Sequence, residues 1–62
     1  MRYWVLARSQ KDNKHCIEWY SSHYERGYVF NIKLADTYKT EEEAIMESPD
    51  DSWKPMYVDW FS

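Results

Sequence analysis

The sequence predicts one small α+β domain over residues 1–62, with an antiparallel sheet and one short helix in the order β-β-β-α-β. Three observations support this fold class. Short stretches alternate between apolar and polar side chains, which is typical of strands. One stretch near residue 41 carries a helix-start signal. Four Trp, six Tyr and two Phe give so short a chain enough large side chains for a core.

The first two strands are expected to form a hairpin. Residues 2–9 alternate loosely and both of their faces are half apolar, so the pattern does not decide which face is buried. The polar stretch 10–14 favours a turn. A second strand is expected to start near His15, with Ile17 and Trp19 together on its buried face.

A third strand is expected over residues 28–34, after a turn at residues 22–27 that contains the single glycine, Gly27. The alternation is clearest in this stretch. A last strand is expected over residues 56–62, returning to the sheet after the helix. The apolar faces of these two strands predict a common core of Tyr28, Phe30, Ile32, Val58 and Trp60.

A short helix is expected between these last two strands. Thr40 is the predicted N-cap, and Glu43, three residues later, completes a capping box. Negative charge at residues 41–43 also suits the positive end of the helix dipole. Pro49 ends the helix because it disfavours helical geometry at Ser48. The side chains available to hold this helix on the sheet are Ala44, Ile45 and Met46.

The chain has one cysteine, Cys16, so no disulfide can form within it, and this favours a reducing compartment. No apolar run reaches the length of a membrane span or of a signal-peptide core. These features predict a cytoplasmic protein that does not contact a membrane.

The residues offer little for metal binding or catalysis. His15, Cys16 and His23 are the one cluster that resembles a metal site, but neighbouring strand residues point to opposite faces and structural zinc needs four ligands. A cysteine nucleophile would need an oriented histidine and an oxyanion hole. The glutamates at 41–43 point in different directions from a solvated helix turn. We expect no catalysis, no metal and no cofactor.

Charge divides the chain into two parts. Through residue 40 the sequence carries seven basic and four acidic residues, a net charge of +3. From residue 41 onward it carries seven acidic residues and one basic residue, a net charge of −6. Such an acidic region is either the solvated surface of a helix or a face that docks a basic partner.

The aromatic residues outnumber what a small core can hold, and exposed Tyr and Trp rings often dominate the energy of protein interfaces. We therefore predict a non-catalytic protein-binding module that docks another protein with a basic surface, or a second copy of itself. The predicted binding residues are Glu42, Glu47, Asp50, Asp51, Trp53 and Tyr57.

The alternative function is single-stranded nucleic-acid binding, with aromatic rings of the N-terminal strands as a stacking platform. This alternative needs the basic residues to cluster around those rings, and a pI near 5.2 opposes it. The residues concerned are Arg2, Arg8, Lys11, Lys14 and Arg26.

Two segments carry a resemblance to a known group of proteins. Residues 27–30 read Gly-Tyr-Val-Phe, and residues 34–44 read Leu-Ala-Asp-Thr-Tyr-Lys-Thr-Glu-Glu-Glu-Ala. In these segments the chain resembles small accessory proteins of bacteriophages, in which a strand is followed by a Thr-Glu-Glu-x-Ala helix. The resemblance implies a phage-encoded inhibitor or modulator in the host cytoplasm, and a host defence factor or nucleic-acid-processing enzyme as its partner. It assigns no functional residue.

Overall fold

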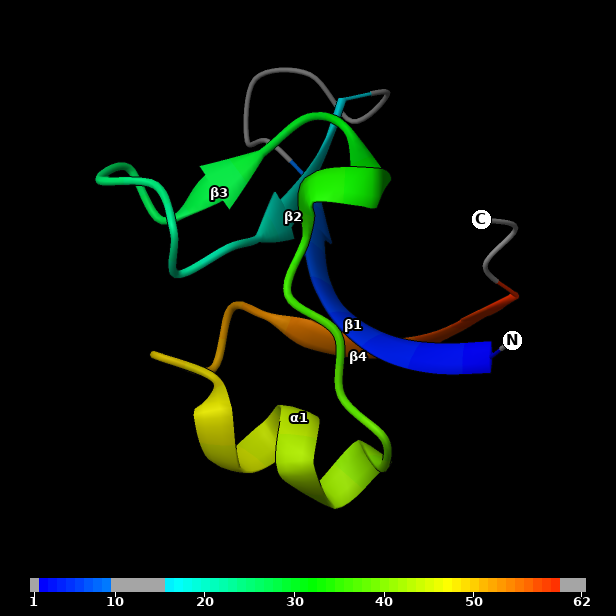
Figure 1. Ribbon diagram of the computed structural model, residues 1–62. Coiled ribbons are helices and arrows are strands. Elements are labelled where there is room, and N and C mark those ends of the chain that lie inside the picture. The colour runs from blue at the N-terminus through cyan, green and yellow to red at the C-terminus, as the bar shows by residue number, and fades with distance from the viewer. Residues whose placement is uncertain (1, 10–15, 60–62) are drawn as a thin grey trace.

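The computed structural model describes residues 2–9 and 16–59, and in this part of the chain a four-stranded antiparallel sheet is combined with one α-helix (Figure 1). The predicted α+β class and the β-β-β-α-β order are confirmed. In chain order the elements are β1 (Arg2–Ser9), β2 (Ile17–Tyr20), β3 (Tyr28–Val29), the 3-10 helix η1 (Ile32–Leu34), α1 (Glu41–Glu47) and β4 (Lys54–Asp59).

The spatial order of the strands is β3-β2-β1-β4, so β1 lies inside the sheet and β4 forms one edge. The expected β1–β2 hairpin is present, with Ala7 opposite Trp19. On its other side, β1 pairs with β4 from Arg2 opposite Asp59 to Ala7 opposite Lys54. The final strand thus returns to the first one, and segments far apart in the sequence lie side by side.

Tyr38 continues the sheet on the side of β1 where β2 pairs. The N–H of Trp4 donates to the carbonyl of Tyr38, and the N–H of Tyr38 donates to the carbonyl of Trp4, both at 2.8 Å. The N–H and C=O of one residue lie on the same side of an antiparallel strand. Trp4 is therefore hydrogen-bonded to Tyr38 and not to Tyr57, the residue opposite it in β4. Burial of the Tyr38 ring raises the pKa of its hydroxyl, which stays protonated.

Both faces of β1 are buried, which answers the question that its sequence left open. Val5, Leu6 and Ala7 are successive buried residues, so they point alternately to the two faces. On one face Leu6 packs with Ala44 of α1 and with Trp53, which precedes β4. Figure 1 shows α1 lying on this side of β1 and β4. Four half-buried aromatic rings surround the cluster: Trp4, Tyr20, Tyr28 and Tyr38.

The third strand is much shorter than expected, because it ends at Val29 and η1 follows. The Asn31 side chain accepts a hydrogen bond from the N–H of Lys33 at 3.0 Å and caps η1, a local bond that competes with strand pairing. Val29 is the buried residue here, whereas Phe30 is 52% exposed and Leu34 is also exposed. The prediction that Phe30 lies in the core is therefore wrong.

Three other predicted core residues are less deeply buried than expected. Tyr28 packs against the Leu6 cluster, and Ile32 and Val58 are half-buried. Trp60 lies outside the described residues. In β2, Ile17 and Trp19 are half-buried, and the buried residue is Glu18 on the opposite face. The reason is an ion pair across the strands, described below.

The predicted helix start is confirmed. Thr40 is the N-cap, and its hydroxyl oxygen accepts from the N–H of Glu43 at 3.1 Å. The Glu43 carboxylate accepts from the N–H of Lys39, one residue before the N-cap. The helix has only two turns and buries Ala44 alone, while Ile45 and Met46 are exposed. The expectation that these two side chains hold the helix on the sheet is wrong.

Candidate functional site

An open hollow of about 510 Å³ lies between the end of α1, the loop that follows it and the start of β4. Apolar and polar side chains line it in about equal measure, and the polar ones include two exposed aspartates and the exposed Lys54. The lining residues are Leu6, Ile45, Ser48, Pro49, Asp50, Asp51, Trp53, Lys54 and Pro55. Apolar surface and an excess of negative charge, two aspartates against one lysine, therefore meet in one concave place.

The loop at the rim is held by hydrogen bonds within residues 48–52. The Asp50 carboxylate accepts from the N–H of Ser52 at 2.8 Å and from the Ser52 hydroxyl. The Ser48 hydroxyl donates to the carbonyl of Asp50 at 2.5 Å. The bonds from Ser52 favour the ionised form and lower the pKa of Asp50. The rim therefore carries a fixed negative charge.

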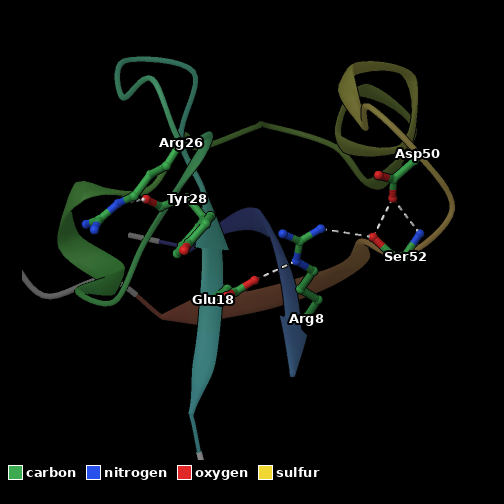
Figure 2. A network of polar contacts seen from close by, with 6 residues as sticks. All are labelled: Arg8, Glu18, Arg26, Tyr28, Asp50 and Ser52. Carbon is green, nitrogen blue, oxygen red and sulfur yellow. Dashed lines mark hydrogen bonds and ion pairs between the residues drawn. The ribbon is translucent and has the colours of Figure 1, made fainter. Parts of the chain in front are cut away.

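Arg8 connects this loop to the centre of the sheet (Figure 2). Its Nε donates to Glu18 Oε1 at 2.6 Å, and Glu18 stands directly opposite Arg8 in the β1–β2 ladder. Its Nη1 donates to the Ser52 hydroxyl at 3.3 Å. One guanidinium thus joins a buried carboxylate to the rim of the hollow.

Trp53 closes the floor of the hollow between two other side chains. The Arg8 guanidinium carbon lies 4.2 Å from the centre of the indole, a cation–π geometry. The Tyr20 ring meets the indole edge-on, with 5.5 Å between ring centres. Trp53 is only 6% exposed, so the prediction of an exposed binding ring is wrong at this position. Its partners come from β1 and β2, far away in the sequence.

The hollow brings together three of the six predicted binding residues, Asp50, Asp51 and Trp53. Glu42 and Glu47 are exposed on α1 but do not line it. Tyr57 is 52% exposed, as expected, and lies along β4 with its ring 5.0 Å from that of Trp4. The acidic region is therefore spread over a helix and a loop, and only the loop borders a concave surface.

Sequence reasoning missed the apolar wall of the hollow, which the exposed Ile45 and the half-buried Pro55 provide; Leu6, which also lines the hollow, is fully buried. The signal for Ile45 was present, because a two-turn helix can turn only a narrow face toward a sheet. Ala44 occupies that face, so its neighbour Ile45 has to point elsewhere.

A second arginine–aromatic cluster lies at the β3 end of the sheet, and it faces solvent. Arg26 Nε donates to the carbonyl of Tyr28 at 2.8 Å (Figure 2). Its guanidinium carbon lies 5.2 Å from the centre of the Tyr28 ring and 5.5 Å from that of the Phe30 ring. Arg26 and Phe30 are exposed, so this cluster is accessible.

Two residues of the possible metal cluster, Cys16 and His23, belong to the described part of the chain. Cys16 is half-buried, and the exposed His23 lies 3.8 Å from the Asp36 carboxylate. No group of three His, Cys, Asp or Glu side chains gathers among the described residues, and His15 lies outside them.

In the described ranges, no helix has the length and apolar character needed to cross a membrane. The chain matches no protein-family model, no curated protein and no solved structure.

Proposed function

We propose that this chain is a non-catalytic protein-binding module that docks a basic surface of another protein at the hollow beside α1. The observation that carries the proposal is that apolar side chains and the carboxylates of Asp50 and Asp51 line the same hollow. A basic side chain entering this place would leave its charge among carboxylates and its hydrocarbon stem against apolar walls.

The charge and exposure around the hollow support the same kind of partner. Glu42 and Glu47 extend the negative region along α1, and the chain has a net charge of −3. Such a field speeds the encounter with a basic surface and slows the encounter with an acidic one. Met46, at 83% exposure, and Ile45 add apolar area beside the acidic rim.

The resemblance to phage accessory proteins adds the class of partner. A host enzyme or defence factor that handles nucleic acid carries a basic surface, and an acidic module could occupy it. On this proposal the chain acts in the host cytoplasm as an inhibitor or modulator.

The proposal is tested by reversing one charge at the rim and one elsewhere. The variants are Asp51→Lys and, as matched control, Glu25→Lys, because both residues are exposed and both substitutions change the net charge equally. The partner is first captured from a bacterial lysate, and its association rate is then measured for both variants at several salt concentrations. Asp51→Lys should slow association several-fold, as added salt does in the parent, because close charges steer encounter.

The control decides what the result means. Glu25→Lys should slow association much less, since Glu25 lies outside the hollow. Equal losses in the two variants would show that net charge alone matters, and the hollow would then not be the docking site.

Single-stranded nucleic-acid binding stays a weaker alternative. Arg8, one of the basic residues that it needs, is paired with Glu18 and packed on Trp53, so its charge is already compensated. Lys11 and Lys14 lie outside the described residues. The exposed cluster of Arg26, Tyr28 and Phe30 is a described place that could stack a base, because an arginine lies over its rings. Loss of oligonucleotide binding in Arg26→Gln, with Asp51→Lys unaffected, would favour this alternative over the proposal.

A further inference from the structure

The outer edge of β4 offers backbone groups to a partner. Trp4 bonds to Tyr38, so Trp4 and Tyr57 form a non-hydrogen-bonded pair of the β1–β4 ladder. The N–H and C=O of Tyr57 therefore point away from β1, toward the open side of the sheet. By alternation the carbonyl of Pro55 points the same way, and Pro55 has no N–H. Among the described residues, no backbone carbonyl outside the strand ladders accepts from the N–H of Tyr57.

This edge runs beside the hollow. Pro55 lines the hollow and shares a face of the sheet with Tyr57, because the two residues are two apart in one strand. A strand added next to β4 would lie about 4.8 Å away, so its side chains on this face would stand beside Pro55 and Tyr57. One of them would enter the hollow from its open side.

The two faces of β4 fit different side chains of a partner segment. On the hollow side, the apolar walls fit the hydrocarbon stem of a lysine or arginine, and the carboxylates of Asp50 and Asp51 fit its terminal charge. On the other face, Met56 is 44% exposed and Val58 is half-buried, and both are apolar. A segment that alternates basic and apolar residues matches both faces at once.

We infer that the partner binds as an extended segment that adds a strand to the outer edge of β4, with a lysine or arginine seated in the hollow. The inference rests on the proposed function and specifies its binding mode. Main-chain hydrogen bonds to Tyr57 provide part of the affinity, and the side chain in the hollow provides the selectivity for basic segments.

Charge favours a basic segment over a second copy of this chain at the same edge. In an antiparallel self-pairing centred on Tyr57, Pro55 would lie opposite Asp59 of the second copy. That places one more carboxylate next to Asp50 and Asp51, and like charges at such short range repel. A lysine in the same position would be attracted.

The test uses a short capped peptide of alternating lysine and valine as the probe, with a glutamate–valine peptide as its charge control. Binding is measured by calorimetry with the parent, Tyr57→Ala and Tyr57→Pro. Both variants lose the phenol ring, but only Tyr57→Pro also loses the outward N–H, which does not bond to β1. Proline is tolerated on an edge strand. Tyr57→Pro should bind the lysine–valine peptide about tenfold more weakly than Tyr57→Ala does.

A second measurement covers the case in which Tyr57→Pro fails to fold. The parent is titrated with two N-methylated forms of the peptide, one methylated on the lysine amides and one on the valine amides. Antiparallel pairing turns the lysine amides toward β4 and the valine amides away from it. Methylated lysine amides should abolish binding, and methylated valine amides should not.

The outcomes separate this inference from the proposed function. One outcome is that the two Tyr57 variants bind the peptide equally well and the parent binds both methylated peptides equally well, while Asp51→Lys still weakens binding. In that case the added strand is wrong and the acidic docking site stands. If the glutamate–valine peptide binds as well as the lysine–valine peptide, both fail. A third outcome is that sedimentation shows a dimer of the parent, that the Tyr57→Pro variant is a monomer, and that the peptide does not dissociate the parent dimer. The edge then binds a second copy, and the inference is wrong.

Discussion

Two arginines lie over aromatic rings in this protein, and their surroundings differ. The Arg8 guanidinium carbon lies 4.2 Å from the centre of the Trp53 ring, which belongs to the Leu6 cluster, and Arg8 pairs with the buried Glu18. Arg26 lies over Tyr28 and the exposed Phe30, and its Nε donates to the backbone carbonyl of Tyr28. Tyr28 lies beside both guanidinium groups, but Arg8 covers the buried Trp53 inside the sheet and Arg26 covers an accessible ring at the β3 edge.

The difference shows that composition does not reveal which residues are available for binding. Both arginines counted equally toward a basic N-terminal half, but the charge of Arg8 is compensated by Glu18. Likewise, Trp53 was expected to be exposed and Phe30 to be buried, and the structure has the reverse. A buried arginine–aromatic contact stabilises the fold, and an exposed one is a candidate contact for a partner.

The largest expected difference between the two clusters is in stability. Trp53→Ala should lower the free energy of unfolding by about 3–5 kcal/mol, because it removes a buried ring from the cluster with Leu6 and Ala44. Phe30→Ala should lower it by less than about 1 kcal/mol, since half of that ring is already in water. Urea unfolding of both variants measures the contrast, and equal losses would place Phe30 in the core after all.

A smaller difference is expected for the charged groups. Glu18→Gln keeps the shape of the side chain but leaves the half-buried Arg8 without its carboxylate, which should cost about 1–3 kcal/mol. Solvent around Arg8 keeps the cost below that of a fully buried pair. Arg26→Gln should change stability by less than about 0.5 kcal/mol. Thermal melts compare the two, and a larger loss in Arg26→Gln would reverse the assignment of the clusters.

The smallest effect concerns the loop that Arg8 reaches. Ser52→Ala removes the hydroxyl that contributes most to the lowered pKa of Asp50, so this pKa should rise toward its ordinary value. A lowered pKa stabilises the fold above the pKa of the unfolded chain, and this contribution disappears as the pH falls through the folded-state pKa. The variant should lose part of that acid dependence. An NMR titration of the Asp50 carboxyl carbon measures it, and an unchanged pKa would assign the shift to the Ser52 N–H alone.

Local signals in the sequence predicted the elements that depend on local chemistry. The helix start could be predicted because its capping bonds are local. The Thr40 hydroxyl accepts from the N–H of Glu43, and the Glu43 carboxylate accepts from the N–H of Lys39. The meander of the first three strands followed from their short connections, but the pairing of β4 with β1 was not predicted. The alternation at residues 28–34 misled, because the Asn31 side chain ends the strand locally before Phe30 can pair.

The candidate site was only partly predictable, because its parts meet through tertiary contacts. Asp50 and Asp51 were recognised from their charge, and they do border the hollow. The burial of Trp53 could not be predicted, since it depends on Arg8 and Tyr20 from two other strands. The outward backbone of Tyr57 follows from the Trp4–Tyr38 bridge, which no sequence pattern indicates.

The pairing of β1 with β4 has a consequence for how the chain folds during synthesis. Of the described strands, β1 is made first and β4 last, and their ladder joins residues 2–7 to residues 54–59. Closing so long a loop is slow relative to forming the β1–β2 hairpin. Until the ribosome has made β4, one side of β1 therefore stays unpaired, with the apolar Val5 and Leu6 next to it. We expect this nascent strand to be the segment that chaperones bind and that misfolds first when synthesis stalls.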